Sequence, residues 1–299
     1  MTRLPQIALL SDGRRLHLQD GPIDLILEAK GDERSVRVAY ELAAARFTGL
    51  LDELCSELPE LRRGAVPAAS SLKGIVARRM YTAVAPYAGE GFITPMAAVA
   101  GSVAEEILSA MLDVAGLDQA YVNNGGDIAL HLGAGAHFTV GLMDRPDRGG
   151  VMRTMTLDSS DPVRGIATSG RHGRSFSLGI ADAVTVLAAT ASRADAAATV
   201  IANAVDLPGH PAIVRVPAND IQPDSDLGAR LVTRGVGELS QAEVKTALAS
   251  GARCARQLFD RGLIEGAVLQ LCGDMLVIGT KHVERQRSRP PVLEVAVHA

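Results

Sequence analysis

The 299-residue sequence has few aromatic residues and no tryptophan. Phe, Tyr and Trp together make up 3% of the chain, and its formal net charge is −4. Single-stranded nucleic acids are usually held by bases stacked on aromatic side chains, and duplexes by clusters of positive charge. Because this chain has few aromatic residues and a net negative charge, we do not expect it to bind nucleic acid.

Cysteine is also scarce. The three cysteines, Cys55, Cys254 and Cys272, are widely spaced, and no C-x-x-C pair occurs. An odd number at such spacings argues against a disulfide framework and against a zinc ribbon. We expect all three to be small buried hydrophobic residues in a reducing compartment.

Long hydrophobic runs are absent as well. No stretch approaches the roughly 18–20 apolar residues that cross a bilayer, and the apolar patch at residues 7–10 is too short for a signal peptide. Hydrophobic residues nevertheless make up 47% of the chain, which is enough for a sizeable core. We therefore expect a cytoplasmic globular protein that does not contact a membrane.

The order of strand-like and helix-like segments predicts an α+β fold. Apolar residues recur with helical period over 33–58, 72–85 and 240–262, and glycine-rich turns join paired strand segments between these helices. Strands in hairpins favour mainly antiparallel sheets over a doubly wound fold. A helix followed by a glycine-rich hairpin occurs at 95–132 and again at 240–279, which hints at an internal duplication.

We expect a single domain with two lobes over residues 1–280. The remainder, 281–299, is basic and contains prolines, which indicates a tail that ends in a short strand at 292–297. The Ala- and Gly-rich helix near residue 100 and the hairpin edges are compatible with a homodimer.

The segment Asn123–Asp127 reads Asn-Asn-Gly-Gly-Asp. Gly125 and Gly126 let backbone N–H groups approach a ligand closely, beside the Asn124 amide and the Asp127 carboxylate. Such a turn could hold a ribose, a pyrophosphate or the edge of a heterocycle. A tight turn with asparagine in a left-handed conformation explains the same residues without a ligand.

The densest polar stretch is 166–177, which reads IATSGRHGRSFS. Arg171 and Arg174 could pair with an anion, and His172 could act as a general acid or base near neutral pH. A serine such as Ser177 could be a nucleophile only if a base lies within hydrogen-bond reach. A solvated surface loop explains the same composition.

Asp195 and Thr199 lie four residues apart in a predicted helix that starts at Ser192. Because positions i and i+4 share a helix face, this carboxylate and hydroxyl could share a hard cation such as Mg²⁺ with phosphate oxygens and water. Alternatively, Ser192 caps the helix and Asp195 completes a capping box. Asp182, just before the predicted strand 183–188, is a further candidate carboxylate.

Thr94 and Pro95 predict the N-cap and first residue of another helix. Small residues then continue to Gly101, which indicates that something packs closely against the helix backbone. Another helix or a sheet would explain them, and so would a ligand held at the helix N-terminus.

Taken in order, these segments resemble the ApbE family of FAD:protein FMN transferases. The shared pattern comprises N-x-G-G-D at 123–127, A-T-S-G at 167–170, V-T-V at 184–186 and A-D-x-x-x-T at 194–199. The segments 94–101 and 179–183 are similar to a divergent branch of that family. The resemblance covers roughly residues 75–210.

The resemblance implies a T-fold-like α+β architecture in two similar halves, a pocket for FAD, FMN or a related nucleotide, and a divalent metal such as Mg²⁺. By this resemblance, Asp195 and Thr199 match the metal-binding helix of the family. The family's glycine turn beside the flavin nucleotide matches Gly125, Gly126 and Asp127. Its Thr-Ser-Gly segment matches Thr168, Ser169 and Gly170.

The chain departs from the family between the Thr-Ser-Gly and Val-Thr-Val segments. The transferases carry His-His-x-x-Asp-Pro there, including the catalytic histidine, whereas residues 171–182 contain neither a His pair nor Asp-Pro. His172 is not at the matching position. The candidate catalytic residues in this chain are His172, Asp182 and Ser177. The candidate cofactor-binding residues also include Arg171, Arg174 and Asn124.

Three functions remain open. The chain could be an ApbE-like enzyme that transfers flavin or cleaves the FAD pyrophosphate with a divalent metal. It could instead bind flavin or another small molecule without transferring it, as the missing histidine segment favours. It could also be a small-molecule hydrolase that reuses the fold, because fold alone does not determine function. In each case the expected partner is a small molecule or nucleotide.

Overall fold

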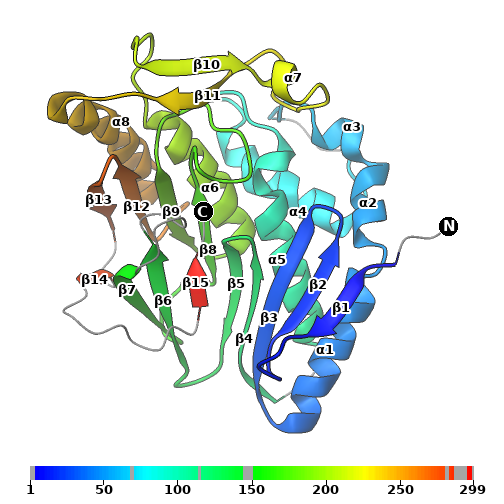
Figure 1. Ribbon diagram of the computed structural model, residues 1–299. Helices are drawn as coiled ribbons and strands as arrows, with labels where there is room; N and C mark the ends of the chain where they lie inside the picture. Colours follow the sequence, from blue (N-terminus) through cyan, green and yellow to red (C-terminus); the bar gives the residue numbers. More distant parts are fainter. Residues whose placement is uncertain are drawn as a thin grey trace.

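One antiparallel sheet of nine strands forms the centre of the protein (Figure 1). The computed structural model describes residues 4–67, 71–113, 116–143, 151–279, 283–285 and 295–297. The strand order is β1-β2-β3-β4-β5-β8-β9-β12-β13. The strand bounds are β1 Gln6–Leu9, β2 Leu16–Asp20, β3 Ile23–Gly31, β4 Leu117–Asn124, β5 Asp127–Leu132, β8 Gly165–Ser169, β9 Ala183–Ala188, β12 Gly266–Leu271 and β13 Asp274–Ile278.

Helices cover one face of this sheet (Figure 1). The longer ones are α1 Glu33–Phe47, α4 Ile75–Val84, α5 Val99–Met111, α6 Ala191–Ala204 and α8 Gln241–Asp260, and the shorter ones are α2 Leu50–Ser56, α3 Leu58–Leu61, η1 Ala85–Tyr87 and η2 Pro95–Ala98. Strand β3 shows why they pack there: Ile23, Leu25 and Leu27 alternate with more exposed residues, so every second side chain joins the core.

A smaller sheet lies against the opposite face, with strand order β14-β7-β6-β15. Its bounds are β6 His137–Met143, β7 Val151–Asp158, β14 Val283–Arg285 and β15 Val295–Val297. Tyr121 of β4 packs edge-to-face on Phe138 of β6, with ring centroids 6.1 Å apart. Together with Ile128 and Leu157, these rings form a core between the two sheets.

The central sheet is built from two halves of the same order. A hairpin, helices and a second hairpin follow one another in β2–β3, α1–α5 and β4–β5, and again in β8–β9, α6–α8 and β12–β13. The expected α+β class with mainly antiparallel sheets is confirmed. The two helix–hairpin units proposed from the sequence correspond to α5 with β4–β5 and α8 with β12–β13. The halves join where β5 pairs with β8.

A lobe of residues 213–236 projects from the second half above the sheet edge (Figure 1). It consists of β10 Ile213–Pro217, α7 Ala218–Ile221 and β11 Leu231–Val236. The Thr94 hydroxyl donates to the Asp226 carboxylate at 2.5 Å, and Arg62 pairs with Asp224 at 2.7 Å. The lobe is thereby held to the first half of the fold.

Several predicted boundaries are wrong. The helix expected over 33–58 is interrupted after α1, because Gly49 adopts φ +82°, and a separate helix, α2, begins after it. Thr94 and Pro95 are the N-cap and the first residue of a helix, as predicted, but this helix is the short η2 that precedes α5, and the Thr94 hydroxyl is bonded to the lobe instead of the helix backbone. The sequence predicts the turn of the second hairpin at Gly273 and Asp274, but the turn lies at Cys272 and Gly273, both with positive φ, and Asp274 already belongs to β13.

The cysteines also differ from expectation. They form no disulfide, as predicted, but Cys55 and Cys272 are exposed and Cys254 is half-buried. Cys55 lies on the outward face of α2, whose buried residues are Leu50 and Leu54, and Cys272 occupies a turn. The described helices include no membrane-spanning candidate.

Candidate active site

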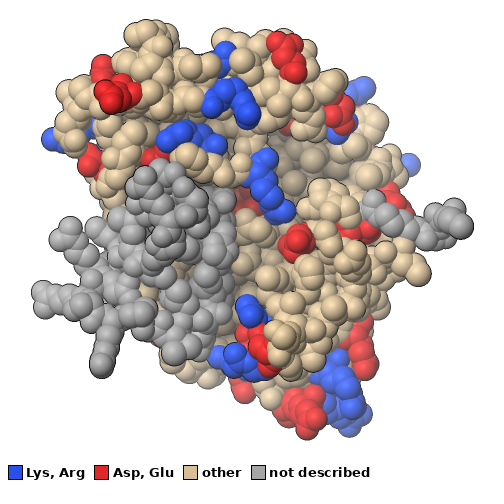
Figure 2. Space-filling view, viewed as in Figure 1, with Lys and Arg blue, Asp and Glu red and all other residues tan. Residues whose placement is uncertain are grey.

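A pocket of about 320 Å³ lies beneath the lobe, where the two halves of the sheet meet α5 and α6. Figure 2 shows a recess below the lobe, and acidic and basic side chains intermix over this face. The volume lies within the range of small-molecule sites. Eight of the residues singled out in the sequence line this pocket: Gly125, Asp127, Thr168, Ser169, Gly170, Arg174, Asp195 and Thr199.

Arg174 lies against the β4–β5 turn at the pocket wall. Gly125 and Gly126 have φ of +64° and +110°, and the Gly126 N–H donates to the Asn123 side chain at 2.8 Å. A Cβ at position 125 would overlap the Arg174 guanidinium. The positive φ therefore favours glycine at 125, and a larger residue there would also have to displace the Arg174 guanidinium.

Asp127 follows this turn as the first residue of β5. Its carboxylate accepts the Thr168 N–H at 3.3 Å, which links the β4–β5 turn to the end of β8. Burial and the nearby Asp195 charge raise the pKa of Asp127 well above its usual value, while the Thr168 N–H and Arg174 act in the opposite direction.

Asp195 is the fifth residue of α6. It is not part of a capping box, because the N-cap of α6 is Thr190, two residues before the predicted cap Ser192, and Thr190 accepts the Arg193 N–H. The Asp195 carboxylate instead accepts the Gly101 N–H at 2.9 Å. Burial raises the pKa of Asp195 to about 7, although N–H groups of α5 partly counteract this.

The small residues of α5 have a structural explanation. A Cβ at Gly101 would overlap the backbone carbonyl of Ala191, so the first turns of α5 and α6 touch directly. The Asn124 side chain adds a bond to the Ala100 carbonyl at 3.2 Å. The close partner anticipated along this helix is therefore another helix, and the pocket lies beside their contact.

The donor atoms fit a hard cation with additional ligands. The two carboxylates share one pocket in which burial disfavours their charges, and Thr199 lies one helical turn beyond Asp195 on the same pocket wall. Within the described residues, no group of three or more His, Cys, Asp or Glu side chains could enclose a metal. Mg²⁺ typically uses one or two carboxylates and completes its shell with phosphate oxygens and water.

A second polar cluster lies apart from the residues that line the pocket. Asp182 pairs with Arg171 at 2.5 Å and with His172 at 3.2 Å, and it accepts the Cys272 N–H at 2.5 Å. These bonds tie the end of β8 to the β12–β13 turn. The cluster thus connects strands, and it places His172 and Asp182 together but outside the pocket lining.

Three other residues singled out in the sequence have local partners. The Ser177 hydroxyl is buried and donates to the Gly179 carbonyl at 3.3 Å. Asn124 is also buried, and Gly126 forms the β4–β5 turn. None of the three lines the pocket.

The sequence interpretation missed the lobe side of the pocket. Asp224 and Asp226 of the lobe line it, as do Arg62, Phe92 and Asn203. Arg230 stacks over Phe92 with its guanidinium carbon 3.2 Å from the ring centre. The polar run after Pro217 has no strand or helix period, so its acidic residues offered no sign that they would meet residues from the first half.

The family model described as AbpE bacteria matches residues 7–277. The chain belongs to this family. Membership in the AbpE bacteria family agrees with the resemblance to ApbE proteins that the Gly-Gly-Asp, Thr-Ser-Gly and Asp-x-x-x-Thr segments indicated, and the matched range extends well beyond those motifs.

Curated relatives of this AbpE bacteria chain are UPF0280 proteins of archaea. That of Methanococcoides burtonii is 42% identical over 127 residues, which cover 40% of this chain and 48% of the relative. That of Archaeoglobus fulgidus is 40% identical over 135 residues, covering 44% and 51%. The chain thus spans about half the length of these two. For Methanopyrus kandleri the identity is 34%, and the coverage is 63% and 72%.

Solved structures similar to the chain include the apo flavinyl transferase ApbE of Pseudomonas stutzeri. It has a TM-score of 0.48 and 11% identity, and the match covers 93% of this chain and 95% of the other. The ApbE protein of Thermotoga maritima has a TM-score of 0.49 and 12% identity, with coverage of 91% and 96%.

Proposed function

We propose that the pocket binds a flavin nucleotide through its phosphate groups, together with a divalent cation at Asp127, Asp195 and Thr199. One observation carries this proposal: two carboxylates that burial holds at raised pKa line the same pocket, next to an arginine. A cation there would relieve the repulsion between them. Membership in the AbpE bacteria family and the ApbE-like motifs favour a flavin as the nucleotide.

Arg174 and the glycine turn supply the phosphate-binding elements. The guanidinium lies against Gly125, where an anion could contact both the side chain and the turn. Phe92 and Phe176 provide apolar ring surface for a heterocycle on the same pocket. When bound, a divalent cation supplies Lewis-acid polarisation of a phosphoryl oxygen.

The proton chemistry of the site depends on its own carboxylates. Among the described residues that line the pocket there is no histidine. Asp195, whose pKa is raised by burial to about 7, can hold or release a proton near neutral pH. Because a carboxylate must be deprotonated to bind a cation, Asp195 releases this proton when the cation binds, so we assign neither Asp195 nor His172 as the general base of FAD cleavage or FMN transfer.

A second candidate is flavin-nucleotide binding without group transfer. The observation that favours it is the position of His172, which pairs with Asp182 instead of lining the pocket. The two candidates share the binding site and differ only in turnover.

Calorimetric titration of FAD and FMN, with and without Mg²⁺, tests the binding. Tight binding that requires Mg²⁺ and is lost in Asp195→Asn is the expected result. Asp260→Asn, at the exposed end of α8, is the matched control and should bind as the unaltered protein does. Absence of binding at high micromolar FAD would refute the flavin proposal. Chromatography of FAD incubated with Mg²⁺ then separates the candidates by the release of AMP, which is accompanied by free FMN if the pyrophosphate is hydrolysed and by protein-bound FMN if FMN is transferred.

A further inference from the structure

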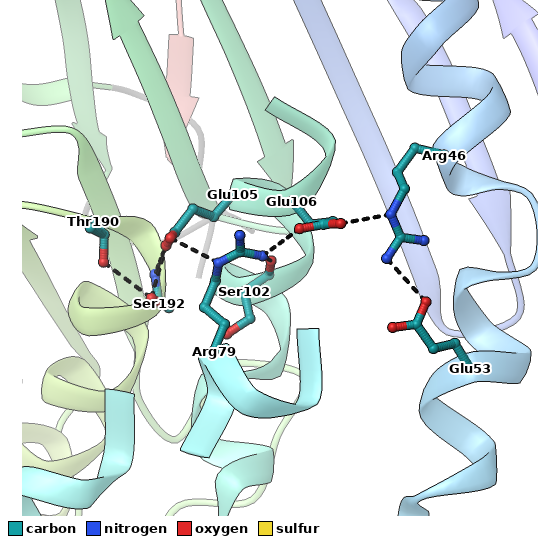
Figure 3. A network of polar contacts seen from close by, with 8 residues as sticks. All are labelled: Arg46, Glu53, Arg79, Ser102, Glu105, Glu106, Thr190 and Ser192. Atoms are coloured by element: carbon teal, nitrogen blue, oxygen red, sulfur yellow. Dashed lines mark hydrogen bonds and ion pairs between the residues drawn. The ribbon is translucent and has the colours of Figure 1, made fainter. Parts of the chain in front are cut away.

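Beside the pocket, α5 carries a glutamate that contacts the first turn of α6. The Glu105 carboxylate accepts the Ser192 hydroxyl at 2.8 Å and the Ser192 N–H at 3.2 Å (Figure 3). Its other oxygen pairs with Arg79 of α4 at 2.9 Å. Glu105 lines no part of the pocket, so its contacts serve the arrangement of the helices.

The contact between the two helices is reciprocal. Glu105 of α5 accepts an N–H from the first turn of α6, while Asp195 of α6 accepts the Gly101 N–H from the first turn of α5. The first N–H groups of any helix lack partners within it and need an outside acceptor. The N-cap residue of α5, Ala98, has no side chain that could serve. Glu105 therefore accepts the Ser192 N–H of α6, which the Thr190 cap leaves free because it accepts from Arg193, and Asp195 accepts the Gly101 N–H of α5.

This exchange determines where the Asp195 carboxylate lies. One oxygen, Oδ2, is bound to Gly101, and the side chain lines the pocket. The position of the carboxylate thus depends on how the first turn of α6 is held against α5. Glu105 and the close contact of Gly101 with Ala191 both hold that turn.

The neighbouring Glu106 offers a natural comparison. It pairs with Arg46 at 2.7 Å and Arg79 at 2.8 Å, so it joins α5 to α1 and α4 (Figure 3). Both of these arginines lie on α1 or α4 and not on α6. Both glutamates share Arg79, but only Glu105 bonds to the helix that carries Asp195.

We propose that Glu105 is a positioning residue for Asp195, and that it is required for cation binding in the pocket because it holds the first turn of α6 in place. This inference rests on the proposed function of the pocket. Partners of metal-binding residues that do not themselves touch the metal commonly change metal affinity 10- to 100-fold when they are removed. Glu105 acts on Asp195 through the helix contact.

The test compares Glu105→Ala, Glu105→Gln and Glu106→Ala. Binding of Mn²⁺, alone and with inorganic pyrophosphate, is followed by the paramagnetic resonance signal of free Mn²⁺. Unfolding in urea reports stability, and hydrogen–deuterium exchange is followed over 96–104 and 190–198. Ser192→Ala, which removes only the hydroxyl donor, is a milder variant in case Glu105→Ala does not fold.

We expect Glu105→Ala to weaken Mn²⁺ binding about tenfold or more and to speed exchange over both segments. Glu105→Gln keeps an acceptor for Ser192 and should stay within about threefold of the unaltered protein. Glu106→Ala should lose stability while its Mn²⁺ affinity changes less than about threefold. Ser192→Ala should weaken binding by about threefold. Equal loss of affinity in Glu105→Ala and Glu106→Ala, or failure of Glu105→Gln to restore binding, would overturn the proposal.

Failure of the proposed function is distinguishable from failure of this inference. If the unaltered protein binds no Mn²⁺ with or without pyrophosphate, the cation site itself is refuted. Exchange then still decides the role of Glu105. Faster exchange over 96–104 in Glu105→Ala, but not in Glu106→Ala, supports positioning through the helix contact, and unchanged exchange contradicts it.

Discussion

Asp182 immediately precedes strand β9 and Asp195 lies in the helix that follows it, and different groups compensate the charges of the two carboxylates. Arg171, His172 and the Cys272 N–H all donate to Asp182. Asp195 accepts backbone N–H groups of α5, and its pKa is raised by burial to about 7. The aspartate before β9 therefore has a compensated charge, whereas the aspartate in the helix after β9 has a poorly compensated one.

The difference indicates separate roles. A buried carboxylate with cationic partners stabilises the fold as long as those partners remain, and it gains little from a further cation. A pair of carboxylates such as Asp127 and Asp195, each with a raised pKa, gains much from one. The pocket is thus the place where an added cation would contribute most, and the Asp182 cluster serves to connect strands.

Neutralising each carboxylate in turn should show the largest difference between the pocket aspartates and Asp182. We expect Asp127→Asn and Asp195→Asn each to weaken Mg²⁺-dependent FAD binding about a hundredfold, or about 2.8 kcal/mol. Asp182→Asn should leave binding within about threefold but lower the free energy of unfolding by about 1–3 kcal/mol. Calorimetry and urea unfolding measure the two effects. A larger loss of binding in Asp182→Asn than in Asp195→Asn would reverse the assignment.

Changing pH should produce the next largest effect. Because Asp195 must lose its proton to bind a cation, and its pKa is raised by burial to about 7, Mg²⁺ affinity should be about tenfold weaker at pH 6 than at pH 8. Calorimetry at both pH values measures the change. An affinity that does not change over this range would contradict the raised pKa.

Without the cation, protonation of Asp195 should stabilise the folded protein, whereas the same protonation weakens cation binding. The folded state holds the Asp195 proton more tightly than the unfolded chain, whose pKa is near 3.8. The resulting stabilisation is present at low pH and is lost as pH rises from about 4 through 7. Urea unfolding of Asp195→Asn should lack this component, whereas Asp260→Asn should retain it.

A smaller effect is expected at the glycine turn. Gly125→Ala would displace the Arg174 guanidinium, so we expect FAD binding to weaken about fivefold through loss of a charge-assisted contact. Gly262→Ala is the matched control: Gly262 also has positive φ, +66°, but open space around it. Both variants should lose about 1 kcal/mol of stability from backbone strain, and only the first should lose affinity. Similar affinities in the two variants would show that Arg174 does not contact the ligand.

The smallest effect concerns the lobe. Thr94→Val removes the hydroxyl that donates to Asp226 at 2.5 Å, so we expect the lobe to open more readily and FAD to dissociate about two- to threefold faster. Stopped-flow fluorescence of the flavin measures the rate. Arg62→Ala breaks a more exposed ion pair with Asp224 and should have a weaker effect. A slower dissociation in Thr94→Val would exclude a role for this bond in closure.

Local patterns predicted much of the fold because the signals were themselves local. The glycines of the β4–β5 turn predicted a tight turn at the right place. Asp195 and Thr199 line the same pocket, as expected of positions i and i+4 in one helix, and their sharing of a cation stays a prediction. The predicted N-cap of that helix was wrong by two residues, and this hid that Asp195 caps a different helix.

The remaining features depend on contacts between distant segments. No local pattern showed that Asp182 would face Arg171 and the β12–β13 turn, or that Asp224 and Asp226 would reach the pocket from the lobe. The proximity of His172 to the Thr-Ser-Gly segment in sequence suggested a shared site. The chain turns after Gly170 instead, where a Cβ would overlap the Asp182 carbonyl, and His172 then meets Asp182.

The most direct test of the central claim is a crystal grown with Mn²⁺ and FAD and measured at a wavelength where manganese scatters anomalously. The account predicts an anomalous peak within coordination distance of Asp127 and Asp195, with phosphate oxygens completing the shell. A peak at Asp182, or flavin bound in the pocket with no manganese near either carboxylate, would contradict it.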